Sequence, residues 1–167
     1  MVDIERFFRE SNAIEDVYSD QALEESLEAW EYLKQQNELE HHIVKETHHL
    51  IMRNRQPELA GEYRDVQVYV GDHVPPKPEV VRMKMQELLQ VQPETAEEAA
   101  QWHISFETIH PFQDGNGRIG RMLYLWHCKQ LGVEPELWTA DERQEYYKIF
   151  QGRNGIIDAD MTNGDSN

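Results

Sequence analysis

The sequence has little cysteine, no long apolar run and few basic residues. Its single cysteine, Cys128, excludes an internal disulfide and favours a reducing compartment. No apolar stretch approaches the roughly 20 residues that a membrane helix needs, and no signal peptide opens the sequence. We therefore expect a cytoplasmic protein that does not bind a membrane.

Acidic residues outnumber basic residues two to one. The 167 residues include 16 Lys and Arg against 32 Asp and Glu, which gives a net charge of −16. Residues 1–40 hold twelve acidic and three basic side chains, so −9 of the net charge lies there. Because a surface of this sign repels the phosphates of nucleic acids, we do not expect a nucleic-acid partner.

Most of the sequence repeats apolar residues at helical spacing. The pattern predicts an all-α domain with helices over residues 3–18, 20–36, 38–54, 78–89, 96–109, 117–131 and 139–150. Ser11-Asn12 offers a break that would divide the first helix into two pieces. The helix over 117–131 is apolar on every side from Met122 to Cys128, so we expect it at the centre of a helical bundle. Neither a repeat nor an interdomain linker interrupts the chain.

Two segments depart from the helical pattern. Residues 63–70 alternate at period two and are followed by a Gly71-Asp72 turn, which predicts a β-hairpin over 62–76. This hairpin either covers an edge of the core or offers an exposed edge to a peptide. Residues 158–167 show no periodicity and are expected to form a disordered tail.

Four histidines lie on the third predicted helix, at positions 41, 42, 48 and 49. A zinc site would explain them, but His42 and His49 are about two helical turns apart, too far for one tetrahedral site without other ligands. The sequence therefore favours surface or half-buried histidines over a metal site.

Residues 110–121, His-Pro-Phe-Gln-Asp-Gly-Asn-Gly-Arg-Ile-Gly-Arg, combine a base, a carboxylate, a glycine turn and two guanidiniums. The glycines let backbone N–H groups point at one anion, and the following helix adds its positive dipole end. Arg118 and Arg121 project from one face as a phosphate clamp, while Asp114 suits Mg²⁺. His110 can take a proton from an attacking hydroxyl. Singly, the glycines also fit a plain turn, the two arginines a solvated helix face and His110 a capped helix end, but together they predict a phosphate site beside a base.

This run resembles the signature of the Fic (filamentation induced by cyclic AMP) domain family, His-x-Phe-x-Asp/Glu-Gly-Asn-Gly-Arg-x-x-Arg, with every fixed position present. The similarity covers most of residues 60–155. It implies one Fic domain over residues 1–157, a helical bundle whose 62–76 hairpin is a flap that docks a target protein. It also implies transfer of AMP from ATP to a hydroxyl of that target, with pyrophosphate as the leaving group.

The resemblance assigns a role to each matching position. His110 would be the general base, Phe112 a packing anchor, and Asp114 the ligand of a Mg²⁺ cofactor. The nucleotide-binding positions would be Gly115, Asn116 and Gly117 as the anion hole, and Arg118 and Arg121 at the β- and γ-phosphates. The related Doc-type kinase carries a lysine in this turn, so Gly117 favours adenylylation.

Ser11 and Glu15 resemble an inhibitory motif of many Fic proteins, Ser/Thr-x-x-x-Glu-Gly/Asn. In that motif the glutamate pairs with the second arginine of the signature and blocks the γ-phosphate position. Carried over, Glu15 would pair with Arg121, and residues 1–18 would form an inhibitory helix. The chain departs from the motif at Asp16, and a serine four residues before a glutamate is also common in an acidic helix.

The sequence thus predicts a protein adenylyltransferase acting on Ser, Thr or Tyr hydroxyls, with ATP as substrate, His110 as base and Glu15 as autoinhibitor. Three alternatives stay open: removal of AMP from a modified protein, phosphorylation of the Doc type, and a nucleotide-binding regulatory module without transferase activity. The identity of the target protein and the choice between monomer and homo-oligomer also stay open.

Overall fold

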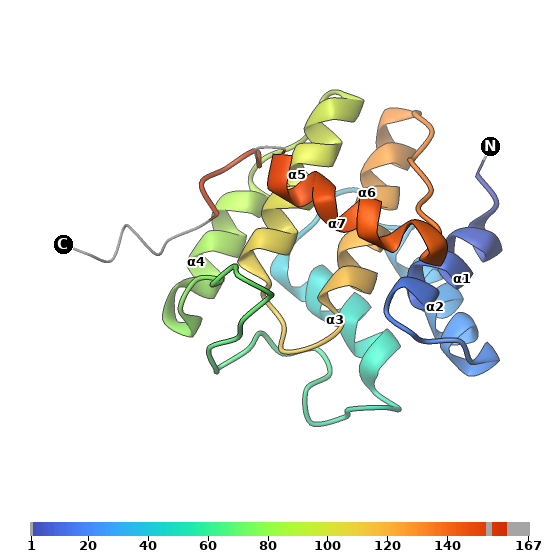
Figure 1. The fold of residues 1–167 in the computed structure, drawn as a ribbon, viewed down its shortest axis with the longest axis horizontal. Helices are drawn as coiled ribbons and strands as arrows, with labels where there is room; N and C mark the ends of the chain where they lie inside the picture. The colour runs from blue at the N-terminus through green and yellow to red at the C-terminus, as the bar shows by residue number, and fades with distance from the viewer. Residues whose placement is uncertain (1, 153–154, 160–167) are drawn as a thin grey trace.

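A computed structural model describes residues 2–152 and 155–159, and over them the chain is an all-α bundle (Figure 1). The α-helices are α1 (Ile4–Ile14), α2 (Asp20–Leu33), α3 (His41–Met52), α4 (Pro78–Leu89), α5 (Ala96–Ile109), α6 (Asn116–Leu131) and α7 (Arg143–Gly152), with a 3₁₀ helix η1 (Ala140–Glu142) before α7. Each lies within a few residues of a helix that the apolar spacing predicts.

Three helices begin at side-chain caps that the sequence supplies. Asp3, Ser19 and Thr95 each accept a hydrogen bond from the backbone N–H three residues later, at 3.1 Å, and so start α1, α2 and α5. The break expected at Ser11-Asn12 is wrong, because α1 continues through both residues. Their side chains are buried against neighbouring helices, and this packing outweighs their weak helix propensity.

Helix α6 lies inside the bundle, as its apolar sequence predicts. Its buried residues extend along its length from Asn116 to Cys128. Helix α5 packs along it most extensively and α1 also packs on it, while α2 and α3 form a second closely packed pair. In Figure 1, α7 crosses in front of α5 and α6. Since Arg121 of α6 also donates a hydrogen bond to Tyr146 of α7, helices from both ends of the chain contact α6.

The predicted β-hairpin over residues 62–76 is not confirmed. The structure contains no strand there, only one isolated antiparallel bridge between Val70 and His73 around the predicted turn. Two prolines, Pro75 and Pro76, lack N–H groups for a returning strand. The carbonyls of this segment are bonded instead by side chains, as described below. We call residues 62–76 the flap segment.

The prediction of a disordered tail over residues 158–167 is wrong for residues 158 and 159. Ala159 is buried in the hydrophobic core, and the carbonyl of Asp158 accepts a hydrogen bond of 2.6 Å from Lys84 Nζ. Residues 160–167, the rest of that prediction, lie outside the described residues.

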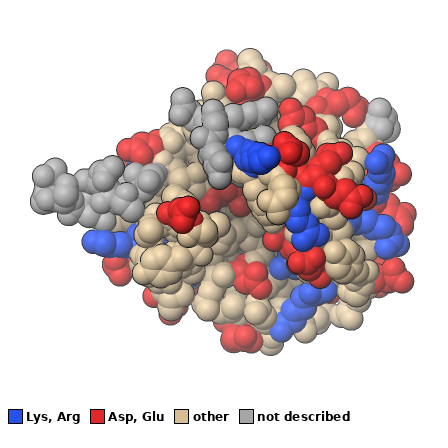
Figure 2. All heavy atoms as spheres, viewed as in Figure 1, with Lys and Arg blue, Asp and Glu red and all other residues tan. Residues whose placement is uncertain are grey.

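Acidic side chains are spread across the face drawn in Figure 2, with basic side chains between them. This distribution agrees with the net charge of −16. None of the described helices is both long and apolar enough to cross a membrane.

Candidate active site

The loop between α5 and α6 is built from two left-handed residues and one asparagine. His110 ends α5 with φ 51°, and Gly115 precedes α6 with φ 85°, a conformation that glycine adopts without strain. Asn116, the first residue of α6, closes the loop: Phe112 N donates to Asn116 Oδ1 at 2.9 Å, and Asn116 Nδ2 donates to Phe112 O at 2.8 Å. The side chain of Asn116 thus bonds back to the loop, while its backbone begins α6.

His48 of α3 supports this loop, a role that the sequence analysis missed. It is fully buried, against the expectation of surface or half-buried histidines. Gly61 N donates to Nδ1 at 2.9 Å, so the ring proton is on Nε2, which donates to Asp114 O at 2.8 Å. The ring stacks on Phe112 with centroids 3.7 Å apart. Burial lowers the pKa of His48 to about 4, so the ring stays neutral and keeps this pattern near pH 7.

His110, the candidate base, is partly buried beside the flap segment. Burial, assisted by the positive charge of Arg64, lowers the pKa of His110 to about 4. The imidazole is therefore neutral at pH 7 and able to accept a proton.

Asp114 and Arg118 lie at the entrance of the loop. The Asp114 side chain is 53% exposed, and its Oδ1 accepts a hydrogen bond from Gly115 N at 2.8 Å. Arg118 is buried, its Nη2 lies 3.9 Å from Asp114 Oδ1, and its Nε has no hydrogen-bond partner among the described residues. An accessible carboxylate beside a buried cation with a free donor fits a ligand that brings both Mg²⁺ and phosphate.

No group of three or more His, Cys, Asp and Glu side chains in the described part of the chain is arranged to hold a metal ion. A zinc cage at the α3 histidines is thus not found among these residues. Mg²⁺, by contrast, characteristically binds through one or two carboxylates together with substrate phosphates and waters. Asp114 alone on the protein side is compatible with that mode.

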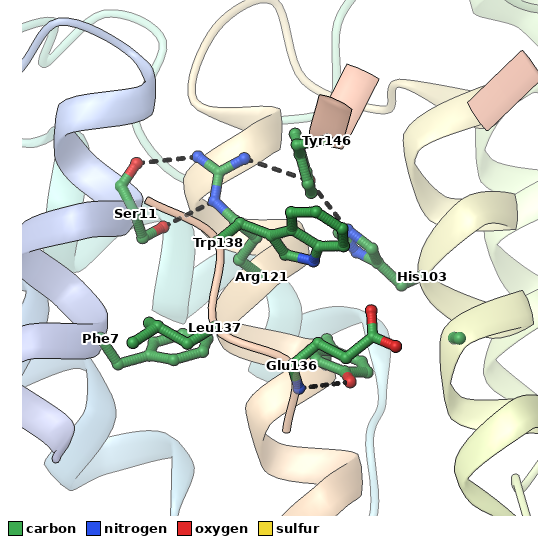
Figure 3. A pocket seen from close by; sticks show the side chains of 10 residues that line it. Phe7, Ser11, His103, Arg121, Glu136, Leu137, Trp138 and Tyr146 are labelled. Carbon is green, nitrogen blue, oxygen red and sulfur yellow. Dashed lines mark hydrogen bonds between the residues drawn. The ribbon is translucent and has the colours of Figure 1, made fainter. Parts of the chain in front are cut away.

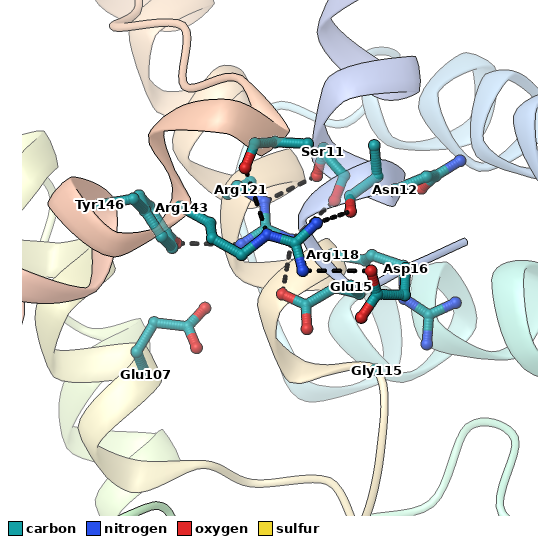
Figure 4. A network of polar contacts seen from close by, with 12 residues as sticks. Ser11, Asn12, Glu15, Asp16, Glu107, Gly115, Arg118, Arg121, Arg143 and Tyr146 are labelled. Atoms are coloured by element: carbon teal, nitrogen blue, oxygen red, sulfur yellow. Dashed lines mark hydrogen bonds and ion pairs between the residues drawn. The ribbon is translucent and has the colours of Figure 1, made fainter. Parts of the chain in front are cut away.

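Arg121 is almost fully buried and is held by α1 and α7 (Figure 4). Its Nε donates to Ser11 Oγ at 2.7 Å and its Nη2 to Ser11 O at 2.9 Å. Nη1 donates to Tyr146 OH at 3.1 Å, and Nη2 pairs with Glu15 Oε1 at 2.9 Å. The structure thus brings Arg121 to Ser11 and Glu15, which lie more than 100 residues earlier in the sequence.

The carboxylate of Glu15 also lies against the first turn of α6. A Cβ added to Gly117 would overlap Glu15 Oε1, so this position has room for the carboxylate only because it is glycine. An anion already occupies the helix N-terminus where the sequence predicts nucleotide phosphates.

Helix α1 ends just before the position where the chain departs from the inhibitory motif, with Asp16 in place of Gly or Asn. Asp16 adopts φ 59°, in the left-handed region that aspartate tolerates better than most residues. Arg143 at the start of α7 holds this end, since its Nη2 donates to Ala13 O at 3.0 Å and its Nη1 pairs with Asp16 Oδ1 at 3.1 Å.

A cavity behind Arg121 is too small to be the nucleotide site. It measures about 20 Å³ and lies between α1, α5, α6 and the segment before η1 (Figure 3). Ser11, His103, Trp138 and Tyr146 are among its lining residues. A space of this size accommodates about one water molecule, whereas small-molecule sites typically enclose about 300 Å³ or more.

Glu107 is a second buried acid near Arg121 that the sequence analysis missed. Its side chain is 14% exposed, and its Oε1 has no hydrogen-bond partner among the described residues. Burial raises the pKa of Glu107 to about 8, so the carboxyl is largely protonated at pH 7. Figure 4 shows it on the far side of the site from Asp16.

Comparison with solved structures shows the same fold in Fic proteins. A Fic-domain signaling protein from Bacteroides thetaiotaomicron superposes with a TM-score of 0.74 at 20% identity, covering 89% of this chain and 70% of the other. Fic-1 from Caenorhabditis elegans superposes with a TM-score of 0.71 at 22% identity, covering 88% and 54%.

Comparison with curated sequences finds relatives of the same family. Protein adenylyltransferase Fic of Nematostella vectensis is 37% identical over 118 residues, which are 66% of this chain and 28% of that protein. Protein adenylyltransferase fic-1 of C. elegans is 32% identical over 130 residues, or 72% and 25%. The chain thus spans about a quarter of the length of these relatives. The model of the Fic/DOC family matches residues 38–128, more than half of the chain. The protein belongs to the Fic/DOC family.

Proposed function

We propose that this protein is an adenylyltransferase that moves AMP from ATP to a Ser, Thr or Tyr hydroxyl of a target protein. The observation that carries the proposal is that the junction of α5 and α6 holds the His110 imidazole, a glycine turn before a helix N-terminus and two buried guanidiniums, Arg118 and Arg121. Relatives that share about two thirds of this chain are named protein adenylyltransferases, which supports the same assignment.

In the proposed reaction, His110 accepts the proton of the target hydroxyl as its oxygen attacks the α-phosphorus of ATP. The bond from the α-phosphorus to the bridging oxygen breaks, and pyrophosphate leaves with those electrons. Arg118 and Arg121 would neutralise charge on the β- and γ-phosphates, and the first N–H groups of α6 would bind phosphate oxygens. Asp114 would hold Mg²⁺, which supplies further charge neutralisation when bound.

We also propose that Glu15 inhibits this reaction. Its carboxylate pairs with Arg121 and lies against Gly117, so it competes with a phosphate for the same donors. Two negative groups cannot share this site without strong repulsion. The triphosphate of ATP would therefore bind weakly or with its α-phosphate away from His110 while Glu15 stays in place.

Intact-protein mass spectrometry after incubation with ATP and Mg²⁺ tests both proposals. The unmodified chain is compared with Glu15→Gly and with Glu15→Gly combined with His110→Ala. We expect an adenylyl-sized addition mainly in Glu15→Gly and none in the double variant. A phosphate-sized addition would instead indicate a kinase. ATP binding without any addition, even when candidate target proteins are supplied, would favour a regulatory module.

A further inference from the structure

Arg64 is a buried arginine whose hydrogen bonds all go to backbone carbonyls. It is 4% exposed and lies at the start of the flap segment. Its Nε donates to His110 O at 2.7 Å, and its Nη2 donates to Ile109 O at 3.2 Å and Pro76 O at 2.5 Å. Its Nη1 donates to Val66 O at 3.0 Å. None of the carboxylates in the described part of the chain forms an ion pair with this guanidinium.

Two of these carbonyls belong to the end of α5, next to the candidate base. Carbonyls in the last turn of a helix lack intrahelical donors, and a cation placed there is favourable. The backbone N–H of Arg64 also donates to Pro111 O at 2.9 Å, so Arg64 holds the peptide groups on both sides of Pro111. His110 has a left-handed conformation that non-glycine residues rarely adopt, and these contacts maintain it.

The other two carbonyls belong to the two arms of the flap segment. Val66 lies on the outgoing arm and Pro76 on the returning arm, so a single guanidinium joins both. Near the turn, His73 Nε2 donates to Thr108 O at 3.0 Å, which ties the segment to α5 a second time. The flap segment is therefore fixed to the end of α5 rather than to a strand.

We propose that Arg64 is a positioning residue that fixes the flap segment and the His110 backbone in one arrangement. A target protein that docks on the flap segment would then present its hydroxyl to the base. The proposal rests on the transfer reaction proposed above. It requires the planar, forked geometry of arginine, because a lysine ammonium presents its donors from one point and cannot reach carbonyls on both elements. The charged and titratable groups that act on His110 are Arg64 and His73 from the flap segment and Glu15 from the end of α1, while Glu107 of α5 acts on it through its backbone.

The test compares Arg64→Lys with two matched variants. Gln67→Ala removes hydrogen bonds within the flap segment, because Gln67 Nε2 donates to Pro75 O at 2.9 Å and Val68 O at 3.1 Å. Arg82→Lys makes the same chemical change at an exposed position of α4. Amide hydrogen exchange, NMR signals of the His110 ring and steady-state transfer in the Glu15→Gly background are the readouts.

Arg64→Lys should speed amide exchange at Val70 and His73, shift the His110 ring signals, and lower kcat by about 100-fold. The KM for ATP should change by less than about two-fold, because Arg64 does not contact the hydrogen-bond donors that would bind the phosphates of ATP. Gln67→Ala should speed exchange in the flap segment without moving the His110 signals, and Arg82→Lys should change none of these readouts.

Wild-type His110 signals and kcat in a folded Arg64→Lys variant would overturn the proposal. If that variant does not fold, the proposal is tested by amide hydrogen exchange in the unmodified chain. The backbone amides of Arg64 and His110 should then be protected from exchange to the same degree. Exchange of the Arg64 amide at the rate of an open loop, with His110 protected, would equally overturn it. The exchange and ring-signal results do not depend on AMP transfer, so failure of the proposed function is recognised separately as absence of transfer in Glu15→Gly.

Discussion

Replacing Glu15 should strengthen ATP binding, by an amount that the structure allows us to estimate. Glu15 makes one charge-assisted hydrogen bond, to Arg121 Nη2 at 2.9 Å, and its side chain is 32% exposed. Such bonds contribute about 1.5–3 kcal/mol, and solvent screening lowers this to about 1–2 kcal/mol. Because ATP must displace that contact, Glu15→Gly should increase its affinity roughly 5- to 30-fold. Glu15→Gln, which keeps a neutral acceptor, should produce a smaller increase.

The fold should tolerate both changes, since Arg121 keeps its hydrogen bonds to Ser11 and Tyr146. Isothermal titration with ATP and Mg²⁺ measures the affinity, with His110→Ala in every variant to prevent turnover. Glu5→Gln is the matched control, because Glu5 is an exposed acid of α1 that pairs with Arg9. Equal affinity in Glu15→Gly and the unmodified chain would refute the reasoning. An equal gain in Glu5→Gln would mean that long-range charge, rather than occupation of the site, opposes ATP.

Three further predictions concern buried titratable groups and the end of α1. Glu107 has a folded pKa of about 8 against 4.5 unfolded, so stability is lost as pH rises between these values, by about 1.4 kcal/mol per unit. Glu107→Gln should therefore match the unmodified chain in urea unfolding at pH 4 and exceed it at pH 8; equal stability at both would contradict a neutral buried acid. The His110 ring should titrate near pH 4 by NMR rather than near 6.5, because burial disfavours its charged form. Arg143→Ala should loosen the end of α1 and raise AMP transfer up to about fivefold. This increase should be smaller than that of Glu15→Gly, because the ion pair between Arg143 and Asp16 is exposed. Mass spectrometry measures the transfer, and an increase that persists when Arg143→Ala is added to Glu15→Gly would show that it does not act through Glu15.

Local sequence patterns predicted most helices and the residues of the α5–α6 loop. Apolar spacing sets the buried face of a helix, and a glycine-rich turn before an apolar helix indicates an anion site through backbone geometry alone. Both signals lie within about 15 residues and need no knowledge of the remaining fold. The same reasoning failed for the flap segment, where alternating valines resembled a strand although side chains of Arg64 and Gln67 bond its carbonyls.

Three site residues could not be predicted from the sequence, because their roles depend on contacts between distant segments. His48 reaches Asp114, 66 positions away, and Arg64 reaches His110, 46 positions away. Glu107 is unusual only because the fold buries it, and an acid in a helix ordinarily indicates a solvated face. No local periodicity distinguishes these residues from exposed ones of the same type.

The three buried arginines near the loop differ in how their charge is compensated, and this difference explains the place of Glu15. Arg64 is satisfied by four carbonyls and needs no anion. Arg118 lies 3.9 Å from its nearest carboxylate oxygen, whereas Arg121 has Glu15 at 2.9 Å. Burying a cation without an acceptor is costly, so a site prepared for phosphates is unfavourable when empty. We infer that Glu15 lowers this cost as an internal anion, and that ATP displaces it by bringing the same charge to the same donors.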